Sequence, residues 1–170
     1  MGIEIERKFL VKGDGWRDAA GRVQPMAQGY LNDLALVDGI RQKASVRVRI
    51  EGDQAFLNIK SRESGHTRQE FDYPVPVDDA RALLALTVGG LVDKRRHYVE
   101  HEGHLWEVDE FLGDNAGLVV AEIELDAADE AFALPDWAGM EVTDQTRYYN
   151  LALASRPYAQ WSEDERRGGA

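Results

Sequence analysis

Apolar and polar residues alternate with a period of two near the start of this chain. Ile3, Ile5 and Phe9 interleave with charged residues between them. Such alternation is typical of a β-strand, because successive side chains point to opposite faces. The first segment therefore predicts a strand with one apolar face and one face that carries two acids and a base, which are Glu4, Glu6 and Lys8.

The same pattern recurs along the chain and predicts further strands. They are expected over residues 27–31, 44–51, 55–60, 68–75, 91–100, 104–111 and 118–125. Gly52-Asp53 between two of them is typical of a hairpin turn. Short helices are expected near Trp16 and over residues 78–86, 126–132 and 144–154.

Eight predicted strands with few helices give a mainly β (α+β) fold class. Nearly every strand carries charge on one face and apolar residues on the other. A closed, eight-stranded antiparallel β-barrel fits this pattern, with a polar charged lumen forming a tunnel and a few helices covering the apolar outer face. We expect one such domain over residues 1–155 and a C-terminal tail over 156–170 whose charged, glycine-rich end is disordered.

Composition narrows the range of partners. The 170 residues carry a formal net charge of −11, which disfavours nucleic acid and anionic membranes as partners. No apolar run approaches the roughly 20 residues of a membrane span, and the N-terminus lacks the apolar segment of a signal peptide. There is no cysteine, which together with these features favours the cytoplasm. A monomer or a homodimer fits equally well.

The charges expected to face the lumen indicate a chemistry. Burying the acidic or the basic side chains alone would be unfavourable. Both sets can share the lumen if metal ions balance the acids and an anionic ligand balances the bases. Mg²⁺ and Mn²⁺ take oxygen ligands and keep substrate phosphate oxygens in their shell, while arginine and lysine hold phosphate. The pattern thus indicates a metal-assisted site for a phosphate chain. The inward set comprises Glu4, Glu6, Glu70, Glu107, Asp109, Glu122, Glu124, Lys8, Arg47, Arg49, Lys60, Arg68, Lys94 and Arg96.

An ordered series of motifs resembles one known family. Glu4-Ile5-Glu6-Arg7-Lys8 resembles the ExExK signature of the CYTH superfamily, the triphosphate tunnel metalloenzymes. Further resemblances follow in the family's order as far as about Leu153. They are Arg47-Val48-Arg49, Lys60, Arg68-Gln69-Glu70, Lys94-Arg95-Arg96-His97-Tyr98, Trp106-Glu107-Val108-Asp109, Glu122-Ile123-Glu124 and the stretch 142–150.

The resemblance implies a tunnel barrel that binds a triphosphate and requires a divalent metal, Mg²⁺ or Mn²⁺. It implies metal ligands at Glu4, Glu6, Glu122 and Glu124, with Asp109 assisting. Catalysis would involve Glu4, Glu6, Lys8 and Glu124. Lys8 would contact the phosphate chain together with Arg47, Arg49, Lys60, Arg68, Lys94 and Arg96.

The expected activity is metal-dependent hydrolysis of the phosphoanhydride bond of inorganic triphosphate (tripolyphosphate) or a related small triphosphate. Three alternatives stay open. They are a class IV-type adenylate cyclase that makes cyclic AMP and pyrophosphate, a thiamine triphosphatase, and a non-catalytic barrel that binds polyphosphate or a nucleotide. The last is disfavoured by the paired acids, because pure anion binding does not need them.

Overall fold

A computed structural model describes residues 2–32, 36–37, 40–61 and 67–169. Its eleven strands in this described part are β1 (Gly2–Val11), β2 (Arg22–Tyr30), β3 (Leu36–Val37), β4 (Ile40–Arg41), β5 (Ala44–Glu51), β6 (Gln54–Ser61), β7 (Thr67–Pro74), β8 (Val88–His101), β9 (His104–Phe111), β10 (Val119–Glu124) and β11 (Ala138–Glu141). The α-helices are α1 (Gly15–Ala19), α2 (Val77–Leu84), α3 (Asn150–Ser155) and α4 (Glu163–Arg166), with 3₁₀ turns η1 (Gly113–Asn115), η2 (Thr146–Tyr148) and η3 (Tyr158–Gln160).

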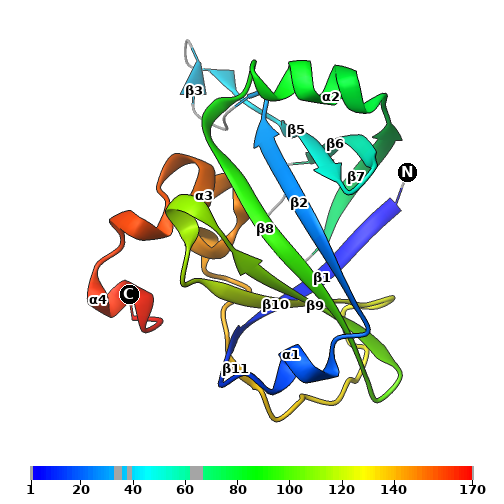
Figure 1. The fold of residues 1–170 in the computed structure, drawn as a ribbon, viewed down its shortest axis with the longest axis vertical. Coiled ribbons are helices and arrows are strands. Elements are labelled where there is room, and N and C mark those ends of the chain that lie inside the picture. The colour runs from blue at the N-terminus through cyan, green and yellow to red at the C-terminus, as the bar shows by residue number, and fades with distance from the viewer. Residues whose placement is uncertain (1, 33–35, 38–39, 62–66, 170) are drawn as a thin grey trace.

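Eight of these strands close into an antiparallel barrel. The order β10-β9-β8-β2-β5-β6-β7-β1 returns on itself because β1 also pairs with β10, with Glu6 opposite Glu124 and Lys8 opposite Glu122. β11 is an extra strand beside the second half of β1. The long strands β2, β8 and β1 cross the molecule obliquely, as strands of a small barrel must (Figure 1). The predicted eight-stranded barrel is confirmed.

The apolar faces of the strands pack on the outside of the barrel, as expected. Phe9 of β1 meets Trp106 of β9 edge to face, with ring centroids 5.5 Å apart, and Trp137 packs on Trp106. Trp16 of α1 is buried against His97 of β8. On another side, α2 covers Val48 and Ala55 through Ala80 (Figure 1). Each strand therefore contributes to a core with one face and leaves the other face for the lumen.

A third apolar cluster lies at the barrel end where β2 stops and β8 starts. Tyr30 and Val92 pack there with Tyr148, Leu153 and Trp161. Gly89 allows α3 to approach closely, because a Cβ at this position would lie 2.7 Å from the carbonyl oxygen of Ala154. The C-terminal segment thus covers this end of the barrel.

The tail differs from the sequence expectation, which was disorder toward its end. The structure describes it as far as Gly169, with Trp161 buried and Ser162 capping α4 in a capping box. Arg156 pairs with both oxygens of Glu165 at 2.7 and 2.8 Å. The charge and glycine content of the tail suggested disorder. Its order comes instead from the buried ring of Trp161 and from the cap that Ser162 provides to α4.

Other local expectations were also wrong, among them the single helix expected over 144–154, where the structure has η2 and then α3. Residues 126–132 form turns rather than a helix, because Glu130 accepts the backbone N–H of Asp126 and pairs with His104, while Phe132 packs on Trp106. β11 was not foreseen, since Ala138–Glu141 shows no alternation. None of the described helices is long and apolar enough to cross a membrane.

Candidate active site

The lumen contains a cavity of about 550 Å³. Among the described residues that line it, eight carry carboxylates and six carry cations, a formal charge of −2. The acids are Glu4, Glu6, Glu51, Glu70, Asp72, Glu107, Glu122 and Glu124, and the bases are Lys8, Arg47, Arg49, Lys60, Arg68 and Arg96. Most of the residues that the sequence placed in the lumen are therefore brought together.

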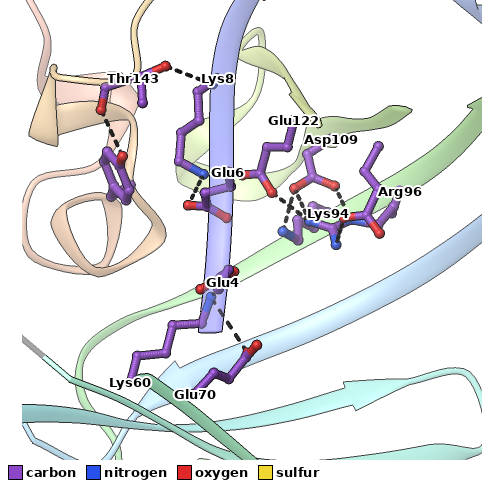
Figure 2. Close-up of polar contacts among 12 residues, drawn as sticks. Glu4, Glu6, Lys8, Lys60, Glu70, Lys94, Arg96, Asp109, Glu122 and Thr143 are labelled. Carbon is purple, nitrogen blue, oxygen red and sulfur yellow. Dashed lines mark hydrogen bonds and ion pairs between the residues drawn. The ribbon is translucent and has the colours of Figure 1, made fainter. Parts of the chain in front are cut away.

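Lys8 lies among the carboxylates of β1 and β10 that line the cavity, which we call the acidic wall (Glu4, Glu6, Glu122 and Glu124). β1 carries it on the same face as Glu4 and Glu6 because its side chains alternate (Figure 2). The buried Nζ lies 2.5 Å from Glu122 and 2.9 Å from Glu6. Burial alone would lower the pKa of Lys8, but these two carboxylates raise it above its ordinary value. The same pairing holds the pKa of Glu6 at about 2, although burial acts in the opposite direction.

Glu4 has a different environment nearer the start of β1. Its Oε1 accepts a hydrogen bond of 2.6 Å from Lys60 of β6, and Glu70 lies 3.7 Å from the same ammonium. Its Oε2 is buried and has no hydrogen-bond partner among the described residues. Burial and the neighbouring Glu6 raise the pKa of Glu4 to about 7, despite Lys60.

A second network continues from Glu122 onto the neighbouring strands β9 and β8 (Figure 2). Asp109 accepts from Lys94 at 2.5 Å and from Arg96 at 2.7 and 2.8 Å. Arg96 also pairs with Glu107 and, at 3.3 Å, with Glu122. Burial and Arg96 lower the pKa of Lys94 to about 8, against the opposing effect of Asp109. Lys94 and Asp109 are almost fully buried and do not line the cavity, so they act on it through Arg96 and Glu122.

Three arginines from β5 and β7 form the basic wall. Arg47 is buried, and its Nε has no hydrogen-bond partner among the described residues. Arg49 lies 3.1 Å from Glu51 and 3.8 Å from Asp72. Arg68 stacks over the ring of Tyr149 at 4.7 Å. Such forked, partly unpaired donors suit the oxygens of a phosphate chain.

Tyr149 was not among the site residues expected from the sequence, yet it lines the cavity. Its ring lines the cavity between Lys8, at 4.6 Å, and Arg68, and its hydroxyl donates to the carbonyl of Thr143. No motif marks this role, because it depends on how the C-terminal segment folds over the barrel end. Tyr30 also lines the cavity, whereas Tyr148 belongs to the apolar cluster beside it.

Other lining residues were missed although the alternation included them. Asp72 continues the face of Arg68 and Glu70 on β7, and Asn58 shares a face with Lys60 on β6. Asn58 donates to Glu70 at 2.6 Å and to Asp72 at 3.2 Å. Extending each charged face by one more residue would have identified both.

The donor chemistry of the acidic wall fits a hard divalent cation. Glu6 and Glu124 are opposite each other on β1 and β10, with Glu4 next along β1, and one oxygen of Glu4 is buried without a partner. In the described part of the chain, however, no three such side chains converge on a common point. Lys60 and Lys8 hold Glu4, Glu6 and Glu122 in ion pairs, so coordination of a metal by these three requires side chains to turn.

Comparison with known proteins agrees with this geometry. The family model described as the CYTH domain matches residues 2–158. A protein of Acetivibrio thermocellus named inorganic triphosphatase is 42% identical over 164 residues, which are 96% of this chain and all of that protein. A second inorganic triphosphatase, from Nitrosomonas europaea, is 39% identical over 155 residues, which are 89% of this chain and 96% of that protein.

The fold is also similar to a solved structure. The crystal structure of an inorganic triphosphatase superposes with a TM-score of 0.64 at 34% identity, and the match covers 91% of this chain and 95% of that one.

Proposed function

The chain belongs to the CYTH domain family, and on that basis we propose that it hydrolyses the phosphoanhydride bond of inorganic triphosphate with the aid of a divalent metal. One observation carries the proposal. The same cavity combines a wall of carboxylates, which suits a metal, with a wall of arginines, which suits a phosphate chain. A site for an anion alone would have no use for eight acids.

The roles follow from position. Glu4, Glu6, Glu122 and Glu124 would hold Mg²⁺ or Mn²⁺, and Asp109 would support them through Arg96. When bound, the metal would offset phosphate charge and lower the pKa of an attacking water. Lys8 would contact the chain next to these acids. Arg47, Arg49, Lys60, Arg68 and Arg96 would bind phosphate oxygens, with Lys94 fixing the second network from behind.

Two carboxylates are candidates for orienting the attacking water and taking its proton. Lys8 holds the pKa of Glu6 at about 2, which makes Glu6 a poor proton acceptor. Partial burial, Glu70 and Glu6 raise the pKa of Glu124, whose side chain still reaches solvent and has no ion-pair partner among the described residues. We therefore favour Glu124 over Glu6 as the base, and with Glu124 in that role the metal would be held by Glu4, Glu6 and Glu122. The arginines would stabilise the charge that develops on the leaving pyrophosphate.

The setting is part of the proposal. We propose that residues 1–155, with the tail that packs on them through Trp161, act as one domain, in the cytoplasm, on a small free substrate, and as a monomer or homodimer. Neither a nucleic acid nor a membrane would be needed, given the net charge of −11.

Product identification tests the function. The protein is incubated with tripolyphosphate, ATP or thiamine triphosphate, each with Mg²⁺ or Mn²⁺, and the products are read by phosphorus NMR. Rapid conversion of tripolyphosphate to pyrophosphate and phosphate, with little change in the others, supports the proposal. Pyrophosphate and cyclic AMP from ATP would indicate a cyclase instead. Faster turnover of thiamine triphosphate would identify that compound as the preferred substrate. Binding without any turnover would indicate a protein that binds the phosphate chain without catalysis.

A further inference from the structure

We propose that lysines of the lumen act as internal counterions that metal and substrate must displace together. Lys60 and Lys8 would leave their carboxylates for phosphate as those carboxylates turn to a divalent cation. Metal and phosphate chain would then bind with positive coupling, and each would bind weakly without the other. The identity of the two ligands rests on the proposed function, whereas the coupling follows from the ion pairs themselves.

The ion pairs are short and buried. Lys60 lies 2.6 Å from Glu4, and Lys8 lies 2.5 Å from Glu122 and 2.9 Å from Glu6. The four side chains of Lys8, Glu6, Glu122 and Glu4 are each no more than 14% exposed. Three of the four carboxylates assigned to the metal are thus already occupied by an ammonium group.

Separating such pairs one partner at a time is unfavourable. A cation that takes Glu4 and Glu6 alone would leave Lys8 with only Glu122 and Lys60 with only Glu70, at 3.7 Å, and both ammonium groups would lie buried beside a divalent charge. A phosphate chain that takes the lysines alone would leave buried carboxylates next to an anion. When both ligands arrive, every charge in the lumen again faces its opposite.

The charge of the cavity lining leads to the same conclusion. With eight carboxylates and six cations, the lining is formally negative before any substrate enters. A phosphate chain therefore meets net repulsion unless a metal accompanies it. Coupling between two ligands is reciprocal by thermodynamic necessity, and typical values change an affinity roughly 5- to 150-fold.

The first test removes the lysine and measures the metal. Isothermal titration calorimetry with MgCl₂, in phosphate-free buffer at about pH 8.5, compares wild type with Lys60→Gln. That pH is above the pKa of about 7 for Glu4, so protons compete little. We expect Lys60→Gln to bind Mg²⁺ more tightly by roughly 5- to 150-fold. Lys12→Gln is the matched control, because it removes one exposed surface lysine, and it should bind like wild type.

The second test removes the acid and measures the anion. Titration of tripolyphosphate in EDTA at the same pH compares wild type with Glu4→Gln. We expect the variant to bind tripolyphosphate more tightly, by a factor in the same range, because Lys60 loses its nearest carboxylate and keeps only the more distant Glu70. Asp18→Asn is the control, because it neutralises an exposed acid on α1. An ordinary structural role would move neither affinity in this direction.

Both gains in affinity are required. Unchanged or weaker Mg²⁺ binding by Lys60→Gln, or unchanged or weaker tripolyphosphate binding by Glu4→Gln, overturns the proposal, provided that circular dichroism shows native folds. Turnover of tripolyphosphate is measured separately. If both affinities rise but the wild type does not hydrolyse tripolyphosphate, the proposed function is refuted and the coupling stands. If the wild type hydrolyses tripolyphosphate but the affinities do not rise, only the coupling is refuted.

Discussion

At the scale of single residues, neighbouring carboxylates on one strand face have different protonation equilibria. Lys8 keeps Glu6 ionised, with a pKa of about 2, whereas burial and Glu6 raise the pKa of Glu4 to about 7. Two identical side chains, two residues apart, therefore ionise in different pH ranges. The difference arises from which lysine lies beside each one and at what depth.

Glu4→Gln should abolish turnover while leaving the fold intact, because it removes a metal ligand but keeps the shape of the side chain.

Arg49→Ala should instead raise KM with a smaller effect on kcat, because it removes a contact to phosphate. Steady-state kinetics with tripolyphosphate and Mg²⁺ checks both variants. An unchanged rate and metal dependence in Glu4→Gln would refute the site assignment.

The pKa of Glu4 also predicts a pH dependence of stability. Between its ordinary value of 4.5 and about 7, the folded protein keeps a proton on Glu4 that the unfolded chain releases. The contribution of this group to the free energy of unfolding therefore falls as the pH rises through that window. Glu4→Gln cannot ionise and should lack this fall.

Calorimetry in EDTA can measure that effect as the difference in Tm between Glu4→Gln and wild type. The difference should shift in favour of the variant between about pH 5 and about pH 8. A constant difference across the range would mean that Glu4 titrates normally.

Alternation alone predicted the residues of the lumen, because the face of a strand follows directly from sequence position. It could not predict their depth. Lys94 and Asp109 occupy strand positions whose side chains should face the lumen. Their buried side chains bond to each other instead and do not line the cavity. Tyr149 was beyond reach as well, since its place depends on a segment that returns from the far end of the chain.

At the scale of elements, strands with clean alternation were predicted well. The expected bounds of β5 and β9 agree with the structure residue for residue. The helix expected at 126–132 failed because side-chain contacts of Glu130 and Phe132 replace helical hydrogen bonds. Tertiary contacts of this kind leave no periodic signal in a sequence.

The C-terminal segment stabilises the covered end of the barrel through Trp161. Its ring packs against Tyr148 and Tyr158, and its indole donates to the carbonyl of Arg156. Trp161→Ala should lower the free energy of unfolding by about 3–5 kcal/mol, as expected for a buried aromatic residue. Urea unfolding followed by circular dichroism would measure this loss.

Arg167→Ala is the control for that experiment, because its side chain is exposed and pairs only on the surface with Glu163. It should change stability by less than about 0.5 kcal/mol. Equal effects of the two variants would mean that the segment does not contribute to the core.

At the scale of the whole molecule, charge opposes the approach of the proposed substrate. The chain carries a net charge of −11, and its metal-bound substrate is still an anion. Raising KCl from about 10 mM to about 150 mM shortens the screening length from about 30 Å to about 8 Å. We therefore expect kcat/KM for tripolyphosphate, at constant concentration of its Mg²⁺ complex, to rise with salt.

Choline chloride at equal ionic strength should have the same effect, which would exclude a specific role for potassium. A fall of kcat/KM with salt would instead mean that the arginines of the lumen steer the substrate from a distance.

The position of β1 limits which mutations the protein can tolerate during evolution. This strand closes the barrel against β10 and also pairs with β7 and β11, so its register is fixed from several sides. A deletion of one residue would turn every following side chain to the opposite face. Phe9 would then face the lumen and Lys8 the aromatic cluster, so catalysis and folding would be lost together. Substitutions on β1 outside Glu4, Glu6 and Lys8 can therefore be tolerated more readily than changes in its length.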